Sequence, residues 1–525
     1  MKKRPAIGPG ALGAGALLAI LPTAALHAAP SAAPEVRDEV RHDLSLPLRY
    51  LVRITHRDHL AAPRAIPLRP IPVPAPLAGA GEDGALQSSM GAPVGTVDGL
   101  NFAGVGEGDY GYSDSFAPPD TNAAVGATQY VQIVNSSFGI FDKTTGALLL
   151  PIANTNTIWA GFGGTCDNNN DGDGIVKYDR IANRWVITQL AVSSTPFTEC
   201  VAVSKTSDAT GAYNRYAFTY GTDFNDYPKF GVWPDGYYVT YNIFANGQFF
   251  TGAKLCALDR RKMLHGKKAK QHCFQLSSAF GGVLPSDLDG ATLPPTGAPN
   301  YMVNFGRNSL NLWKFHVDFA TPANSTLTGP TNLAVPAFTA LCGGGTCVPQ
   351  KGGSTLDSLA DRLMYRLAYR NFGDHEALVV NHSVSANGVG GVRWYELRSP
   401  GASPTLFQSG TFAPNKLYRW MGSVAMDKAG DMAVGYSESS SKSFPSIAYT
   451  GRLPSDPPGT LQGEKIVKAG GGSQNGGLSR WGDYTAMTLD PVDDCTFFYT
   501  NEYLKANGSF NWSTQINTFK FPNCQ

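Results

Sequence analysis

Apolar and polar positions alternate in short runs, and the same arrangement of runs recurs along the chain. Two clear copies begin at Gly422, with GSVAMDKAGDMAVGYSES, and at Asp483, with DYTAMTLDPVDDCTFFYTNE. Each has an apolar run, a polar turn with Asp, a second apolar run and a polar exit, which predicts a β-hairpin. With looser copies included, the pattern occurs seven times, anchored at Ala123, Ile175, Phe230, Tyr301, Leu363, Gly422 and Tyr484.

The spacing of the anchors predicts how many strands each repeat holds. Successive anchors lie 52 to 71 residues apart, which is too long for one hairpin and fits four strands. Repeats of four strands arranged radially form a β-propeller. We therefore expect an all-β fold over residues 95–525, a seven-bladed β-propeller of four-stranded antiparallel blades. The last repeat has only three strands before the chain ends, so an N-terminal strand near Asp98–Val105 is expected to close the ring.

The composition agrees with this fold and removes some functions. The 59 glycines, 22 tyrosines and 27 phenylalanines favour many short strands joined by tight turns. With 42 Lys and Arg residues against 41 Asp and Glu residues, the chain has no charge excess for binding nucleic acid or an anionic membrane. We expect a monomer without a nucleic-acid partner.

The N-terminal residues predict export. Residues 1–29 have a basic start, an apolar stretch broken by Gly and Pro, and small residues near Ala28, which together predict a signal peptide and not a membrane span. We expect a secreted protein, extracellular or periplasmic, without a membrane span. Residues 30–94 are rich in Ala and Pro and are interpreted as a largely disordered linker or propeptide, with one short helix or strand near LRYLVRITHRDHL.

The eight cysteines all follow the signal peptide, and their even number suits disulfides in an oxidising compartment. We favour pairs between sequence neighbours: Cys166 with Cys200, Cys256 with Cys273, Cys342 with Cys347, and Cys495 with Cys524. The second pair should lie on the third and fourth strands of blade three, and the last pair on the second and third strands of blade seven. A zinc site is the weaker alternative, because no Cys-x-x-Cys pair or histidine cluster supports it.

Three long stretches carry a resemblance to known proteins. They are DYPKFGVWPDGYY at 226–238, DRLMYRLAYRNFGDHEALVVNHSV at 361–384, and RWGDYTAMTLDPVDDCTFFYTNEY at 480–503. In these stretches the chain resembles a family of secreted bacterial β-propeller proteins that has no assigned function. The resemblance covers most of the chain after Gly95. It implies export and a propeller, and it implies no reaction.

The propeller fold places two sets of residues at one rim of its central channel: those just before each inner strand and those just after each second strand. The first set supplies charged and aromatic residues from nearly every repeat, including Asp120, Asp173, Asp226, Tyr227, Lys229, Asp361, Arg362, Arg419, Trp420, Arg480, Trp481 and Asp483. The second set includes Asn135, His382, Glu438 and Glu502. We expect these groups to converge.

The residue types at this rim suit a polar ligand that contains rings, such as a glycan. Paired carboxyl groups hydrolyse glycosidic bonds, so the candidate catalytic residues are Asp226, Asp361, Asp483, Glu438 and Glu502. Arginine forks hold carboxylate or sulfate groups and aromatic faces cover sugar rings, so the candidate ligand contacts are Tyr227, Lys229, Arg362, His382, Arg419, Trp420, Arg480 and Trp481. For any single residue, a structural role in turns or in packing between blades is an equally good interpretation.

An acidic loop, DNNNDGDG at residues 167–174, is a second candidate site. Its alternating oxygen ligands around a glycine have a spacing that suits calcium: Asp167, Asn169, Asp171 and Asp173. The usual closing ligand is missing, because the ninth position is Ile175 and the twelfth is Tyr178. Calcium is therefore the one cofactor that the sequence suggests, and a solvated turn is the equal alternative.

Export, fold and rim together favour a carbohydrate-active propeller, either a glycoside hydrolase or a polysaccharide lyase. A non-catalytic binding or adhesion module that uses the same face is the competing hypothesis, and a calcium-dependent hydrolase is a third. The sequence has no Gly-x-Ser-x-Gly elbow, His-Glu-x-x-His motif or phosphate-binding glycine loop. The residues alone leave open whether the protein is an enzyme.

Overall fold

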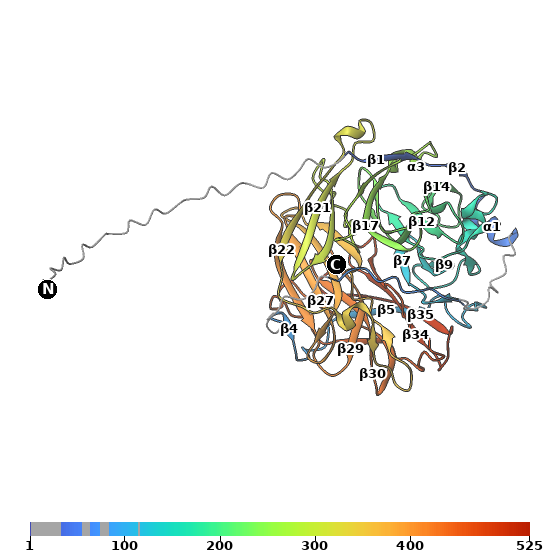
Figure 1. Cartoon of the computed structure of the whole chain (residues 1–525). Coiled ribbons are helices and arrows are strands. Elements are labelled where there is room, and N and C mark those ends of the chain that lie inside the picture. Colours follow the sequence, from blue (N-terminus) through green and yellow to red (C-terminus); the bar gives the residue numbers. More distant parts are fainter. Residues whose placement is uncertain (2–32, 55–63, 74–82, 114–115) are drawn as a thin grey trace. The chain divides into compact units, whose positions relative to one another are not determined.

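The computed structural model describes Met1 and residues 33–54, 64–73, 83–113 and 116–525. Apart from Met1, the predicted signal peptide lies outside the described residues. Within the described part, strands dominate and helices are short (Figure 1). The helical elements are α1 (Leu48–Ile54), α2 (Thr165–Asn168), α3 (Arg260–Leu264), η1 (Thr155–Trp159), η2 (Pro322–Asn324) and η3 (Leu341–Gly344). The prediction of an all-β fold is confirmed.

The first three repeats form three separate antiparallel sheets, as the alternating apolar runs predict. The first sheet contains β7 (Asn122–Val125), β8 (Gln129–Val134), β9 (Ser137–Asp142) and β10 (Ala153–Asn154). The second contains β11 (Val176–Asp179), β12 (Arg184–Ala191), β13 (Phe197–Ser204) and β14 (Tyr213–Gly221). The third contains β15 (Phe224–Val232), β16 (Tyr237–Ala245), β17 (Phe249–Leu258) and β18 (Lys270–Gln275).

The fourth and fifth repeats share one nine-stranded sheet. Its strands are, in order, β22 (Thr326–Ala334), β21 (Ser309–His316), β20 (Asn300–Gly306), β19 (Leu284–Asp289), β25 (Met364–Asn371), β26 (Glu376–Ala386), β27 (Val389–Arg398), β28 (Thr405–Phe412) and β4 (Leu86–Gln87). β19 pairs with β20 at its start and then, in parallel, with β25. This hydrogen bonding joins two predicted blades and does not confirm the count of seven.

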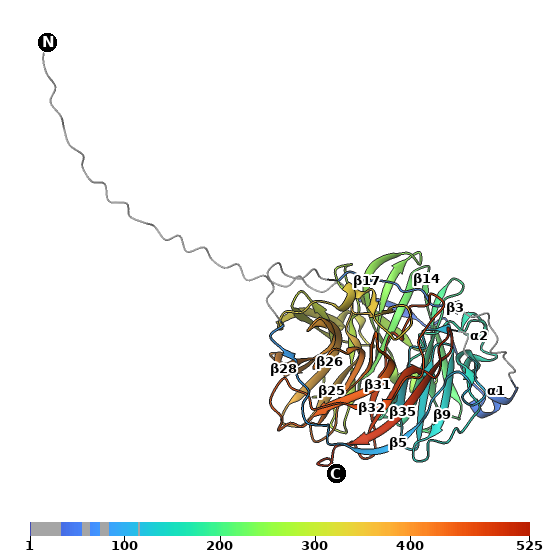
Figure 2. The same cartoon turned by 90° about the horizontal axis from the view of Figure 1, so that it is seen from below.

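The last two repeats form four-stranded sheets. One contains β29 (Tyr418–Met426), β30 (Met432–Ser440), β31 (Ser443–Arg452) and β32 (Lys465–Lys468), and the other β33 (Ala486–Leu489), β34 (Phe497–Leu504), β35 (Trp512–Lys520) and β5 (Val97–Ala103). β5 pairs antiparallel with β35, so the predicted N-terminal strand of the last sheet is confirmed (Figure 2). The first strands of successive repeats contact one another in chain order, and β33 contacts β7.

The segment 30–94 differs from the expected disordered linker in its described parts. β1 (Glu35–Asp38) pairs with β18, and β2 (Arg41–Leu44) pairs with β14. β3 (Arg64–Ala65) pairs with β6 (Phe116–Ala117), and β4 pairs with β28. The expectation is wrong there because sheet edges offer free main-chain N–H and C=O groups, which any extended segment can satisfy whatever its side chains. The predicted short helix is α1.

The four predicted disulfides are all present: Cys166–Cys200, Cys256–Cys273, Cys342–Cys347 and Cys495–Cys524. The second lies on β17 and β18, as predicted. The last does not lie on its predicted strands, because Cys495 precedes β34 and Cys524 follows β35. A further small sheet pairs β23 (Thr346–Val348) with β24 (Leu356–Asp357).

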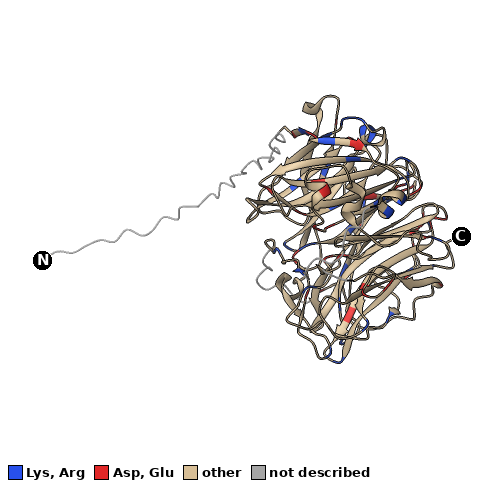
Figure 3. Ribbon diagram, turned by 90° about the vertical axis from the view of Figure 1, so that its right-hand side faces the viewer, with Lys and Arg blue, Asp and Glu red and all other residues tan. Residues whose placement is uncertain are grey.

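Charged residues of both signs are interspersed over the described ribbon (Figure 3). This agrees with the near balance of 42 basic and 41 acidic residues in the whole chain. Among the described residues, no helix is both long enough and apolar enough to cross a membrane.

Candidate functional site

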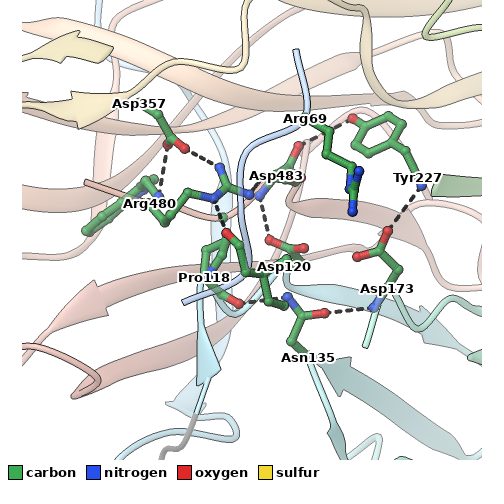
Figure 4. A network of polar contacts seen from close by, with 12 residues as sticks. Arg69, Pro118, Asp120, Asn135, Asp173, Tyr227, Asp357, Arg480 and Asp483 are labelled. Atoms are coloured by element: carbon green, nitrogen blue, oxygen red, sulfur yellow. Dashed lines mark hydrogen bonds and ion pairs between the residues drawn. The ribbon is translucent and has the colours of Figure 1, made fainter. Parts of the chain in front are cut away.

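Many of the predicted rim residues converge at one end of the inner strands (Figure 4). They lie just before an inner strand, in its first residues or in a neighbouring loop. We call the following cluster the mouth: Asp120, Asp173, Asp226, Tyr227, Lys229, Asp357, Asp361, Arg362, Arg480 and Asp483. A β-bulge in β15 separates Asp226 from Lys229, and bulges of this kind re-aim side chains near functional sites.

Main-chain amides of one repeat bind side chains of another across the mouth. The Asp483 N–H donates to Asp120 Oδ1 (2.7 Å), and the Tyr227 N–H donates to Asp173 Oδ2 (3.2 Å). The Asp173 N–H donates to Asn135 Oδ1 (2.8 Å). These bonds link the first, second, third and last repeats, so the mouth is held together by residues that are far apart in the sequence.

The main chain of the mouth adopts costly conformations. The φ angle is 49° at Asp120, 47° at Asp173 and 58° at Tyr227, in the left-handed region that costs a bulky residue on the order of 1 kcal/mol. At Gly172, where φ is 104°, a Cβ would lie 2.5 Å from Asn135 Oδ1, so a larger residue would push this amide away from Asp173. Strained residues of this kind cluster at functional sites.

A buried ammonium group lies among the acids. Lys229 is fully buried, and its Nζ lies 3.4 Å from the centre of the Tyr227 ring and 4.0 Å from the centre of the Tyr484 ring. Burial lowers the pKa of Lys229 to about 8, and the charges of the mouth aspartates, led by Asp173, oppose that shift. Because it is buried, Lys229 neutralises part of the acid charge without reaching a ligand, and its predicted ligand contact is wrong.

The two arginines of the mouth are committed to ion pairs. Arg362 donates to Asp361 through Nε (2.7 Å) and Nη2 (3.0 Å). Arg480 donates to Asp483 through Nη2 (2.7 Å) and to Asp357 through Nη1. The mouth thus holds six carboxyl groups and three basic groups. An anionic ligand would meet surplus acid and guanidinium groups that are already paired.

Asp226 differs from the other mouth carboxyl groups. Its side chain is partly exposed and has no hydrogen bond or ion pair with another described residue. Burial and the neighbouring charge of Asp173 raise the pKa of Asp226 to about 7, although Arg362 and Arg69 act against this. Burial also raises the pKa of Asp173, an effect that Lys229 opposes. At neutral pH, Asp226 can therefore both donate and accept a proton.

A pocket of about 370 Å³ lies beside Asp226. Carboxyl groups, apolar side chains and part of the N-terminal segment line it, including Asp171, Asp173, Asp226, Leu190, Val192, Phe197, Phe224 and Arg69. Its volume falls within the range of small-molecule sites. The pocket brings one unpaired acid, further carboxyl groups and two aromatic rings within reach of the same ligand.

Trp420 and Trp481, predicted to cover a sugar ring, are packing residues instead. Both indoles are fully buried with their ring centres 5.9 Å apart, and Trp481 Nε1 donates to Ser437 Oγ (3.0 Å). Indoles are large apolar groups, and removing them from water stabilises the fold more than an exposed position at the rim would. All eight tryptophans of the chain are buried, so no indole face is free to contact a ligand.

Arg419 and Glu438 belong to a separate cluster. They face each other on β29 and β30, and the buried Arg419 donates to Glu464 through Nε (2.8 Å) and Nη2 (2.7 Å). The predicted ligand contact of Arg419 is therefore wrong. Burial, followed by the charge of Glu464, raises the pKa of Glu438 to about 7. Glu438 is a buried acid of its own sheet and does not line the pocket beside Asp226.

His382 and Glu502 also support the fold. His382 is fully buried, with Nε2 2.9 Å from the Tyr395 hydroxyl and its ring stacked on Tyr395. Burial lowers the pKa of His382 well below its usual value, so it stays neutral, and its predicted ligand contact is wrong. Glu502 is buried and accepts the Gly482 N–H, which positions the loop before β33. Neither residue lines the pocket.

The acidic loop does not gather its four predicted calcium ligands. Asp167 Oδ2 accepts the Gly163 N–H (3.0 Å), and the Asn169 amide donates to Ser194 Oγ (3.4 Å). Asp171 accepts the main-chain N–H groups of the segment that follows β12, and Asp173 faces the mouth. The described residues contain no group of three or more His, Cys, Asp or Glu side chains arranged for a metal ion. The predicted arrangement is wrong, and calcium itself stays a prediction.

Two contributors to this site follow from no repeat. Asp357, at the end of β24, accepts the Trp481 N–H (2.9 Å) and an Arg480 N–H. Arg69 comes from the segment interpreted as a linker and donates to the Gly247 carbonyl (2.9 Å). Neither lies at a position that the strand pattern marks, because both belong to irregular chain. Only the presence of charged residues in these loops could have pointed to them.

Comparisons with known proteins do not assign a family. No family model matches the chain, and no curated protein matches its sequence. The resemblance to secreted bacterial propellers therefore has no match behind it at the level of a family.

Among solved structures, 104 chains match. An endo-arabinase from Bacteroides thetaiotaomicron is 13% identical over 52% of this chain and 92% of its own, with a TM-score of 0.27. A Hadza microbial sialidase is 10% identical over 74% of this chain and 73% of its own, with a TM-score of 0.35. The WD40 domain of SCAP from fission yeast is 6% identical over 76% of this chain and 81% of its own, with a TM-score of 0.33. Similarities this weak carry no argument about reaction or ligand.

Proposed function

We propose that the protein binds a neutral glycan at the mouth and hydrolyses it, with Asp226 as the proton donor and Asp173 as the second carboxyl group. The observation that carries this proposal is the unpaired, partly exposed Asp226 carboxyl group, whose pKa of about 7 suits a general acid at neutral pH. A glycosidase pair needs one protonated and one ionised carboxyl group on the two sides of the scissile bond. Asp173 lines the same pocket and interacts electrostatically with Asp226.

The other predicted acids are less suited to this reaction. Asp361 is held by Arg362, and Asp483 is held by Arg480, so both ionised forms are already stabilised by a neighbouring charge. The surplus of acid and the paired arginines also disfavour an anionic polysaccharide, and with it the lyase alternative. A neutral glycan meets neither obstacle, because its hydroxyl groups accept and donate hydrogen bonds without adding charge.

A non-catalytic binding module is the second candidate, and a specific observation favours it. Asp120, Asp357 and Asp361 accept main-chain N–H groups from other parts of the chain, as scaffold carboxylates do. If Asp226 merely completes this scaffold, the mouth binds a glycan without cleaving it.

The finer predictions about the whole chain belong to the same proposal. We interpret the nine-stranded sheet as two blades of a seven-bladed propeller, because the first strands of all seven repeats contact one another in chain order. Four disulfides favour an oxidising compartment. Export by residues 1–29 as a monomer, and calcium at the acidic loop, are parts of the proposal that await experiment.

The test is to assay the purified full-length protein on a panel of neutral and anionic polysaccharides by reducing-end release. Asp226→Asn should lower kcat/KM on the best neutral substrate by about 100-fold or more, because it removes the proton donor. Asp374→Asn is the matched control, since Asp374 is an exposed carboxylate far from the pocket lining, and it should leave turnover unchanged. Turnover that survives in Asp226→Asn would refute the role of Asp226. Binding without turnover in the unaltered protein would support the binding module.

A further inference from the structure

Residues 64–73, RAIPLRPIPV, lie across the mouth, and we call them the strap. β3 at its start pairs with β6, and the Ile66 N–H donates to the Ala117 carbonyl (2.7 Å). In Figure 4 the strap passes in front of the mouth, with Arg69 beside Tyr227. Part of the strap also lines the pocket beside Asp226. The strap therefore occupies the approach that an external ligand would use.

Charged side chains of the mouth hold the strap by its main chain. Arg480 Nε donates to the Ile66 carbonyl (2.8 Å), and Arg362 Nη2 donates to the Arg69 carbonyl (2.9 Å). Asp361 Oδ2 accepts the Ile71 N–H (2.9 Å). These are hydrogen-bonding groups that remain after the ion pairs inside the mouth are made, and all three are directed at peptide groups.

Proline prepares the strap for these contacts. Each of the three residues that the mouth binds through its main chain stands directly before a proline: Ile66 before Pro67, Arg69 before Pro70, and Ile71 before Pro72. A following proline disfavours the helical conformation and holds a residue extended. An extended, proline-rich segment loses little conformational entropy when it binds, which is why such segments are common peptide ligands.

Two side chains of the strap add specificity. The Arg69 guanidinium lies 4.4 Å from the centre of the Phe224 ring, and Arg69 Nη1 donates to the Gly247 carbonyl (2.9 Å). Arg69 also opposes the negative charge of Asp226. Ile71 is buried against Phe224 and Phe244. By contrast, the three prolines and the first two residues are not buried, so the strap lies on the surface of the sheets and is not part of their core.

We propose that the mouth is a binding site for an extended, arginine-bearing, proline-rich peptide, that the strap is its resident ligand, and that an external ligand reaches the mouth only when the strap leaves. The mouth meets this peptide with complementary groups: surplus acid for the arginine, guanidinium groups for two carbonyls, a carboxylate for one N–H, and aromatic rings for the isoleucine and the arginine. The blocking of a glycan rests on the proposed function, whereas peptide binding does not.

The test uses the full chain with a recognition sequence for a specific protease inserted between residues 54 and 64 and between residues 73 and 83. After cleavage, the strap is held only by non-covalent contacts. The probe is a fluorescein-labelled synthetic peptide, RAIPLRPIPV, measured by anisotropy. It should bind the cleaved protein and not the uncleaved protein, and a matched peptide with Arg69→Ala should bind at least about tenfold more weakly. Absence of exchange after cleavage, or equal binding of the two peptides, would overturn the proposal.

Glycan assays on the same samples separate the two proposals. Higher glycan turnover or binding after cleavage, reversed by the unlabelled peptide, supports both. Peptide exchange without activity on any glycan leaves the strap proposal standing and removes the proposed function. Equal glycan turnover with and without bound peptide overturns the blocking role. If the cleaved protein unfolds, the full-length Arg69→Ala variant replaces it: hydrogen exchange of residues 64–73 should rise, while the exposed Arg49→Ala control should leave it unchanged. Unchanged exchange in Arg69→Ala would overturn the proposal.

Discussion

The two ends of the inner strands use charge in opposite ways. At the far end, basic and acidic side chains pair closely: Lys177 and Arg366 with Asp287, Arg366 with Asp289, Arg180 and Arg370 with Asp494, and Lys143 with Asp490. The pocket there is only about 30 Å³. At the mouth, six carboxyl groups face three basic groups, Asp226 is unpaired, and the pocket is about 370 Å³.

This contrast separates charges that build the fold from charges that are available to a ligand. A buried carboxylate with a guanidinium partner has its charge compensated, and it has little left to offer a ligand. A carboxyl group without a partner keeps a raised pKa and a free hydrogen-bonding surface, which are the properties of a binding or catalytic group. Counting charges along the chain would not have distinguished the two ends, because both are rich in Asp and Arg.

The largest expected effect comes from breaking the paired end. Arg366→Met should reduce the free energy of unfolding by about 3 to 5 kcal/mol, because it leaves buried Asp287 and Asp289 without their shared partner. Urea denaturation at pH 7 measures this. The control is Arg398→Met, which removes a partly exposed partner of Glu396 and should cost about 1 kcal/mol or less. Equal losses in the two variants would contradict the view that the far end is structural.

A smaller effect is expected from the buried lysine of the mouth. Lys229→Met should reduce the free energy of unfolding by about 2 to 3 kcal/mol at pH 7, since it removes the cation among Asp173, Asp120 and Asp483. The loss should shrink at pH 5, because uncompensated carboxyl groups then become protonated. Urea denaturation at the two pH values tests this, with exposed Lys428→Met as a control that changes neither value. A loss that is independent of pH would show that Lys229 acts by packing alone.

The smallest effect is the pH dependence that Asp226 contributes to stability. Its folded-state pKa of about 7 lies above the ordinary value of 3.8, so between these pH values the folded protein binds a proton that the unfolded chain has released. The free energy of unfolding of the unaltered protein should therefore fall, relative to that of Asp226→Asn, as the pH rises from about 4 to 7. Thermal melts of both proteins across this range measure the difference. Parallel curves would mean that the pKa of Asp226 is ordinary.

Local patterns were enough to predict the hairpins and the disulfides. Alternating apolar residues and polar turns depend on neighbours in the sequence, so β29 with β30 and β33 with β34 appear where the pattern puts them. The positions just before inner strands were also predictable, and Asp120, Asp173, Asp226 and Asp483 do meet. The same reasoning was wrong for Trp420 and Arg419, because it cannot tell whether a side chain at that position turns toward the channel or into the sheet packing.

By itself, the sequence determined the all-β class, the repeat, the cysteine pairs and the set of residues from which the mouth is drawn. The tertiary structure alone decided which carboxyl groups are paired, because Asp361, Asp483 and Asp226 look alike in the sequence and differ only in what folds against them. It also decided the place of the strap. Main-chain hydrogen bonds from Arg480, Arg362 and Asp361 hold that segment, and main-chain groups are the same in every residue, so the sequence carries no mark of them.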